Sequence, residues 1–273
     1  MLNFCYNFAV FPRRISVVER EPQACRAVVQ RRKAFTLIEM LVVMGIIALL
    51  MVLVAPAFTT IKGGTDVTSA AYTIKGALDQ ARTYAKANNT YTWVGFYEEN
   101  VSNPSPNSVT PKVGRVLISI VASNDGTTIY DPSSPLKITT TKLIQVGKLI
   151  KIENVHLTTF TANPSGTGST FDTRPNVPSA YRIGDTAPAS SLTPFQYPVA
   201  NPEPTAQYTF VKAIQFSPSG EARVNNSTGS YSLQTAAEIG LRPTHGTTVD
   251  TSNPNVVAIQ FSGLGGTVVI YRE

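Results

Sequence analysis

The feature that most constrains this chain is an uninterrupted apolar run of 19 residues, Met40–Phe58, with a cluster of cations just before it. As an α-helix the run is about 28 Å long, close to the ~30 Å hydrocarbon core of a bilayer. It is apolar on every face, which excludes an amphipathic surface helix. Because Arg31, Arg32 and Lys33 mark the N-terminal end as cytoplasmic, the sequence predicts one transmembrane helix with an exported C-terminal body.

Two other interpretations of the run fit less well. Its length and its basic flank argue against a helix buried in a soluble core. A cleaved signal peptide usually has an apolar segment of only about 7–15 residues. The one small-residue triplet that resembles a signal-peptidase site, Ala55-Pro56-Ala57, contains a proline that does not suit cleavage.

The net charge of +6 belongs almost entirely to the N-terminal segment. Residues 1–34 hold seven cations against two anions, and the rest of the chain is nearly neutral. A nucleic-acid-binding domain needs a basic surface on its folded part, so the charge pattern argues against nucleic acid as a partner. Both cysteines, Cys5 and Cys25, lie in the same segment, so the body can contain no disulfide and no cysteine-based metal site.

One carboxylate, Glu39, stands at the start of the apolar run, one helical turn beyond Phe35. An ionised acid at the centre of a membrane helix costs ~2.5–3.5 kcal/mol, and such residues are normally paired and functional. A cut between Ala34 and Phe35 would create an α-amino group close to this acid. The amine of one subunit could then neutralise the acid of another, which makes Glu39 a candidate assembly residue.

Residues 31–58, RRKAFTLIEMLVVMGIIALLMVLVAPAF, resemble the N-terminus of the type IV pilin and type II secretion pseudopilin superfamily. That family has a basic leader, a cleavage-site glycine, phenylalanine, Thr or Ser, Leu, Ile or Val, Glu and a long apolar helix. The resemblance implies that a prepilin peptidase cuts between Ala34 and Phe35 and that Phe35 is N-methylated. It also implies that Glu39 registers the subunit in a filament and that Pro56 kinks the helix.

Ala34 departs from the family pattern, which usually has glycine before the cut. The extra methyl group predicts slower processing. Further along, LDQARTYAKANNTYTWVGF (78–96) resembles H-type minor pseudopilins and related prepilin-like proteins, in which a helix end leads into the first strand.

Beyond the run, small and apolar residues recur at helical spacing from Val67 to Ala85. Asn88-Asn89 predicts the end of this helix, whereas Pro56 and Gly63-Gly64 predict a bend before it. We expect an α+β fold in which a long N-terminal helix packs on an antiparallel β-sheet domain. Its expected parts are a removed leader (1–34), a transmembrane and assembly helix (35–61), an amphipathic half-helix (62–90) and an exported β-rich domain (91–273).

The exported body has strand signals, rich in β-branched and aromatic residues, at 91–99, 115–123, 142–152 and 156–161. The motif Ala-Ile-Gln-Phe-Ser occurs at 213–217 and again at 258–262. A turn and a second β run follow each copy, which predicts two β-hairpins. Residues 162–206 are rich in Pro, Gly, Ser and Thr and predict a long exposed loop.

Catalysis and metal binding find little support in the sequence. His156 and His245 are far apart and have no neighbours at metal-ligand spacing, and His156 fits a structural role in a strand. No phosphate-binding loop and no nucleophile elbow occurs in the sequence. Asn124, Asp125 and Asp131 carry oxygens that calcium could use, but Asn124-Asp125-Gly126 is more typical of a turn. We expect no enzyme activity, no cofactor and no metal.

Two functions remain. The first is a structural subunit, a minor pilin or pseudopilin, of a type IV pilus-like or type II secretion-like filament. Its partners would be prepilin peptidase, other pilin or pseudopilin subunits and the bacterial inner membrane, which the chain would cross once before it reaches the filament or cell surface. The alternative is a membrane-anchored binding or adhesion module outside any filament. Its loop would use the aromatic residues Phe171, Tyr181, Phe195 and Tyr197.

Overall fold

The protein is described by a computed structural model, which covers residues 35–104, 113–127, 140–160, 164–185, 195–198, 208–210, 212–225, 231–233 and 236–273. Within these ranges the side chains of residues 53–65, 140, 225 and 231–233 are not described. The chain divides into two compact units, Met1–Leu49 and Leu50–Glu273. The predicted α+β class is confirmed, with one helix at the N-terminal side and an antiparallel sheet after it.

Helix α1 runs from Leu37 to Ala87 and its assignment continues through Pro56 and Gly63-Gly64. The helix ends where the sequence indicates, because Asn89 takes a left-handed φ of 49° that stops the helical path. The bend near Pro56 stays a prediction. In the part of the chain that the structure describes, no helix combines the length and the hydropathy that a membrane crossing requires.

The strands form one large sheet in the order β10-β9-β8-β1-β2-β4-β11-β13-β14, and a separate two-stranded ribbon, β6–β7. Neighbours pair antiparallel, apart from β5, which runs parallel to β11. The strands are β1 (Thr92–Asn100), β2 (Gly114–Ser123), β3 (Leu143–Gln145), β4 (Ile150–Thr158), β5 (Arg182–Ile183), β6 (Phe195–Tyr197), β7 (Tyr208–Phe210), β8 (Lys212–Phe216), β9 (Ala222–Asn225), β10 (Tyr231–Leu233), β11 (Ala236–His245), β12 (Thr248–Val249), β13 (Val257–Ser262) and β14 (Val268–Arg272). Two short 3-10 helices, Thr140–Lys142 and Ser179–Tyr181, complete the described elements.

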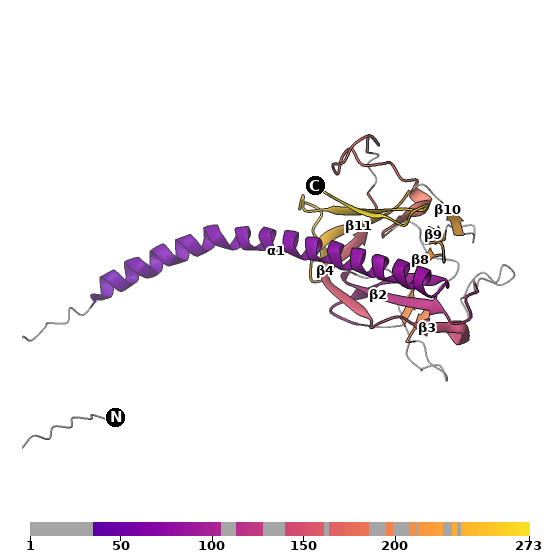
Figure 1. The fold of residues 1–273 in the computed structure, drawn as a ribbon. Helices are drawn as coiled ribbons and strands as arrows, with labels where there is room; N and C mark the ends of the chain where they lie inside the picture. The colour runs from indigo at the N-terminus through magenta and orange to yellow at the C-terminus, as the bar shows by residue number, and fades with distance from the viewer. Residues whose placement is uncertain are drawn as a thin grey trace, which may run out of the picture. The chain divides into compact units, whose positions relative to one another are not determined.

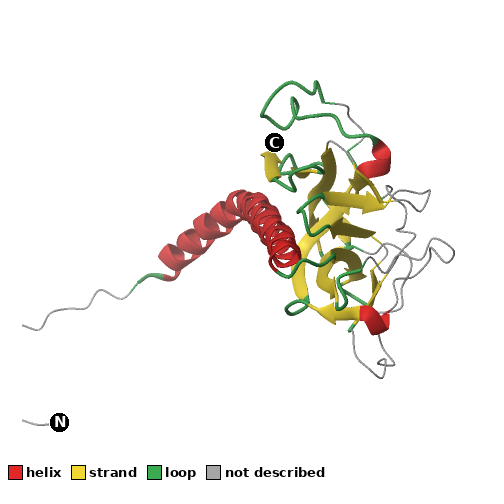
Figure 2. Cartoon of the chain, turned by 45° about the vertical axis from the view of Figure 1, so that its right-hand side comes forward, coloured by secondary structure: helices red, strands yellow, loops and turns green. Residues whose placement is uncertain are grey.

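The inner face of the sheet packs on the C-terminal half of α1 (Figures 1 and 2). The helical stripe of the sequence forms the buried side of the helix, and its many alanines let the backbone approach the strands closely. Opposite it lie large side chains from strands throughout the sheet, among them Phe96, Ile118 and Ile259. The sheet curls so far around the helix that distant strands come into contact. The Ala222 amide at the start of β9 donates to the Gly263 carbonyl after β13 at 2.7 Å.

The outer face of the sheet is covered by the segment that the sequence predicts to be an exposed loop. Residues 164–185, here called the strap, place Phe171 beside Phe160 and Ala258 over the C-terminal strands. The β6–β7 ribbon places Phe195 and Phe210, both fully buried, over β1 and β8. Within the described parts of 162–206, residues 165–170 are exposed as a surface loop would be, whereas Phe171, Arg174 and Phe195 are buried against the sheet.

Two further strand predictions need correction, whereas both hairpins are confirmed as β8–β9 and β13–β14. The sequence assigns one strand to 142–152 and another to 156–161. In the structure the first is broken at Gly147, whose φ of 83° favours glycine, so that β3 and β4 are separate strands. β4 then continues past Asn154, which absorbs an irregularity in the ladder with a φ of 62°.

Gly95 is the position that lets the ribbon lie directly on the sheet. A Cβ atom there would sit 2.5 Å from Phe195 Cζ and 2.6 Å from Phe210 Cβ, whose rings stack with centroids 5.1 Å apart. We expect Gly95→Ala to lower the free energy of unfolding by ~1–3 kcal/mol, because the ribbon must shift. Chemical denaturation of the full chain in detergent, followed by fluorescence, measures this.

Gly76→Ala is the matched control for that substitution. Gly76 lies inside α1 and a Cβ atom there would meet nothing within 4 Å. The alanine should stabilise the helix by up to ~1 kcal/mol. Equal effects of the two substitutions would show that the ribbon does not rest on Gly95.

Candidate functional site

The residues that the sequence marks for processing and assembly, Phe35 and Glu39, both lie at the start of α1. Phe35 precedes α1 and is 77% exposed. Thr36 donates its backbone N–H (2.8 Å) and its hydroxyl (2.9 Å) to Glu39 Oε2, and the Glu39 amide donates to Thr36 Oγ1 at 3.3 Å. This reciprocal arrangement is a capping box, which satisfies N–H groups that a helix start leaves without partners.

The capping box gives Glu39 a role that our sequence reasoning missed. The signal was present, because threonine followed three residues later by glutamate before an apolar run is a helix-start signature. The box holds the carboxylate at the positive end of the helix dipole, where a negative charge is favoured. The structure tests neither the cut nor the kink, since Ala34 and the Pro56 side chain lie outside what is described.

The first part of α1 is apolar and exposed on all sides. Every described side chain from Leu37 to Val52 is exposed, and most are Leu, Ile, Val or Met. An exposed apolar surface of this extent marks a site of interaction with protein or lipid.

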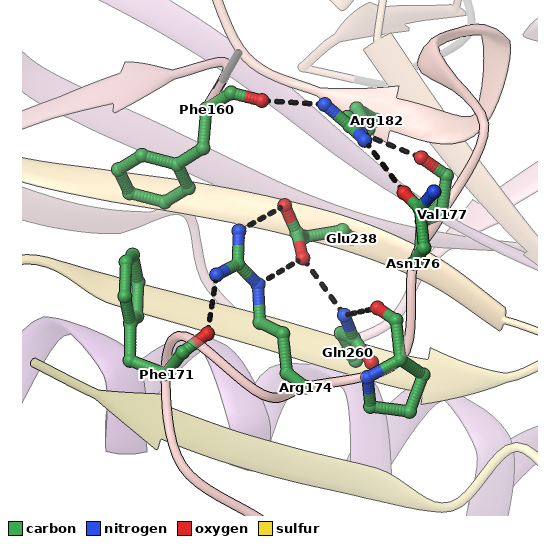
Figure 3. Close-up of polar contacts among 9 residues, drawn as sticks. Phe160, Phe171, Arg174, Asn176, Val177, Arg182, Glu238 and Gln260 are labelled. Carbon is green, nitrogen blue, oxygen red and sulfur yellow. Dashed lines mark hydrogen bonds and ion pairs between the residues drawn. The ribbon is translucent and has the colours of Figure 1, made fainter. Parts of the chain in front are cut away.

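The strap is fixed to the sheet by a buried ionic network (Figure 3). Arg174 Nε lies 2.7 Å from Glu238 Oε2 on β11, and both side chains are only 3% exposed. Arg174 also donates to the Phe171 carbonyl at 2.6 Å, and its guanidinium carbon stands 4.2 Å from the centroid of the Phe171 ring. Gln260 on β13 donates to Glu238 Oε2 at 2.8 Å, so strap and sheet share one satisfied network.

Arg182 holds the C-terminal end of the strap in place through hydrogen bonds. Its guanidinium donates to the carbonyls of Phe160 and Val177 and to the side chain of Asn176. Figure 3 shows these bonds beside the Arg174 cluster. With Phe171 and Phe195 buried and Tyr181 and Tyr197 half-buried, the four aromatic residues do not form the exposed binding surface that the sequence suggested.

A third polar cluster lies where the strap ends. His156 Nδ1 is 2.8 Å from Glu98 Oε1, which also accepts the Leu157 amide at 2.8 Å. Lys212 donates its ammonium to the Gly184 carbonyl. Burial lowers the pKa of Lys212, and the carboxylates of Glu98 and Asp185 partly offset this. His156 is thus buried and bonded in β4, as its predicted structural role requires.

The remaining candidates from the sequence do not converge on a site. Asp125 accepts the Thr127 hydroxyl, the Ser123 hydroxyl and the Thr127 amide, and these bonds, with Lys142 nearby, hold the pKa of its carboxyl far below the usual range. Asp131 lies outside the described residues. His245 is on β11, 3.6 Å from Asp250 Oδ2. No group of three metal-binding side chains occurs among the residues that the structure describes.

Comparison with known families identifies the N-terminal segment. Residues 29–55 match the family model of the prokaryotic N-terminal methylation motif. The match confirms the resemblance of this segment to the type IV pilin and pseudopilin superfamily, and it spans Ala34, Phe35 and Glu39. No curated protein and no solved structure gives a match to the chain.

Proposed function

We propose that this chain is a structural subunit, a minor pilin or pseudopilin-like protein, of a type IV pilus-like or type II secretion-like filament. The observation that carries the proposal is the methylation motif at residues 29–55. Prepilin peptidase removes residues 1–34, Phe35 is N-methylated, and the mature subunit assembles with others of its kind. The resemblance of residues 78–96 to H-type minor pseudopilins supports a minor role.

The geometry of the helix start supports this proposal. Phe35 and Thr36 precede the helix, so the chain leaves the cut site in a non-helical form that a peptidase can bind. The capping box uses Glu39 Oε2, and the other oxygen, Oε1, is the one that we expect to meet the Phe35 amine of a neighbouring subunit. Such an arrangement neutralises both charges within an apolar bundle.

The same segment supports membrane anchoring before assembly. Met40–Phe58 has no charged residue, and the described part of α1 up to Val52 is exposed. We propose that residues 35–61 cross the bacterial inner membrane once, with the cations of the leader in the cytoplasm and the β-rich domain exported. In the filament, contacts with other subunits replace the lipid, and Pro56 supplies the kink.

Co-expression with a prepilin peptidase tests the proposal. The full chain should shorten by its leader in cells with an active peptidase and stay intact in cells with an inactivated one. We expect the cut to be slower than in the Ala34→Gly variant, because the methyl group of Ala34 hinders binding of the cut site in the peptidase. A chain that keeps its full length beside an active peptidase would refute processing.

A further inference from the structure

His156 lies between two carboxylates that belong to different parts of the fold. Its Nδ1 is 2.8 Å from Glu98 Oε1 on β1, and its Nε2 is 3.9 Å from Asp185 Oδ2 at the C-terminal end of the strap. The side chains of His156 and Glu98 are only 8% and 2% exposed, whereas that of Asp185 is 37% exposed. One imidazole ring on β4 therefore connects the end of the strap with β1.

Asp185 is held in this position by the chain around it. Its Oδ1 accepts the amide of Thr159, the residue that follows β4, at 2.8 Å. Burial raises the pKa of the Asp185 carboxyl, but the hydrogen bonds from Thr159 and the nearby His156 outweigh this effect and hold the pKa below its ordinary value. The carboxylate of Asp185 therefore stays negatively charged between pH 5 and pH 8.

Two cations lie near the ring, and each has a partner of its own. Lys212 on β8 donates its ammonium to the Gly184 carbonyl. Arg242 on β11 is paired in register with His156, but its Nη1 donates to the Thr251 carbonyl at 3.3 Å. The two ring nitrogens thus face carboxylates, and an opposite charge at this distance favours the protonated form of the ring.

The charge of the ring decides how it interacts with Asp185. A neutral imidazole has one N–H, so when Nδ1 donates to Glu98, Nε2 presents a lone pair to the Asp185 carboxylate. A protonated imidazole has two N–H groups and attracts both carboxylates. Histidine ordinarily changes its charge between about pH 5 and pH 8. We propose that His156 is a pH-sensitive latch, which holds the C-terminal end of the strap on the sheet when it is protonated and releases this end as the pH rises.

The latch acts on the end of the strap and not on its whole length. Arg174 and Arg182 bind the rest of the strap, and arginine keeps its charge throughout this pH range. The change should therefore be confined to residues 183–185 and to the Thr159 amide that bonds to them. The stabilisation is present while the ring is protonated and is lost as the pH rises through the titration of the ring.

Asp185→Asn tests the latch in the full chain in detergent. The asparagine can still accept the Thr159 amide, but it carries no charge that the ring can attract. We expect this substitution to lower the melting temperature by roughly 2–4 °C more at pH 5.5 than at pH 8. In a His156→Asn background the difference between the two pH values should disappear, because that amide can still donate to Glu98 but does not titrate.

The pair of His245 and Asp250 provides the matched control. His245 Nε2 is 3.6 Å from Asp250 Oδ2, but the two side chains are 54% and 20% exposed, so the solvent screens the pair. Asp250→Asn, alone and in a His245→Asn background, should show a pH-dependent difference below ~1 °C.

A nuclear magnetic resonance titration of the parent chain gives a second readout that needs no variant. The Thr159 amide should shift with the same midpoint as the His156 ring, because it donates to the carboxylate that the ring attracts. A shift of this amide that does not follow the ring would overturn the proposal.

Two results of the Asp185→Asn experiment would also overturn it. One is an equal loss of melting temperature at both pH values. The other is a greater loss at pH 8, which would mean that Lys212 and not His156 neutralises the carboxylate. The leader and the filament take no part in these measurements, so their result is independent of the proposed assembly role.

Discussion

Arg174→Ala will lower the free energy of unfolding of the β-rich domain by roughly 3–5 kcal/mol, the largest stability effect that we expect from a single substitution. Arg174 and Glu238 are both almost fully buried, so removing the cation leaves the carboxylate without its charge partner in a low dielectric. The strap also loses the stacking of the guanidinium on Phe171. Fluorescence of Trp93, the only tryptophan, should report a melting temperature lower by roughly 10 °C.

Arg223→Ala is the matched control for this substitution. Arg223 also pairs with a glutamate, Glu221, but the two side chains are 37% and 31% exposed, and such pairs contribute less than ~1 kcal/mol. The double variant Arg174→Met with Glu238→Leu should recover part of the loss, because apolar residues replace the pair without an uncompensated charge. If Arg174→Ala were as mild as Arg223→Ala, the network would not anchor the strap.

Glu39→Ala will leave membrane insertion intact and reduce incorporation into filaments by roughly 100-fold. Without the acid, the Phe35 amine of a neighbouring subunit stays unpaired in an apolar bundle. An unpaired intramembrane charge costs ~2.5–3.5 kcal/mol, and every 1.4 kcal/mol corresponds to a tenfold change in an equilibrium. The ratio of subunit in sheared filaments to subunit in the membrane fraction measures the effect.

Two controls separate pairing from a general defect. Glu153→Ala removes an exposed carboxylate from β4 and should leave incorporation unchanged. Thr36→Val keeps the Glu39 carboxylate but removes the hydroxyl that binds it, so it should weaken incorporation less than Glu39→Ala does. Equal incorporation of Glu39→Ala and the parent chain would contradict the pairing of acid and amine.

What the sequence predicts well depends on short-range patterns. The processing motif lies within a few residues around Phe35, and the buried stripe of α1 and the two hairpins follow from local periodicity and turns. The capping box is local too, and the spacing of Thr36 and Glu39 would have been enough to identify it. These features can be predicted without knowing which residues distant in the sequence are in contact.

The strap and the ribbon could not be predicted in the same way. Arg174 and Glu238 are 64 residues apart, and nothing near either residue signals the other. The Pro- and Gly-rich composition of 162–206 indicates irregular backbone, but irregular backbone can still cover an apolar sheet face. The row that Trp93, Gln215 and Arg223 form across β1, β8 and β9 is likewise visible only in the register, because these residues become neighbours only through strand pairing.

The mass of the mature N-terminus shows whether prepilin peptidase processes the chain between Ala34 and Phe35. The chain should be purified from membranes of cells with an active prepilin peptidase and analysed by mass spectrometry of its N-terminal peptide. We predict a peptide that begins at Phe35 and carries one N-methyl group. A peptide that begins at Met1, or one cut beyond Ala57 as in a cleaved signal peptide, would contradict it.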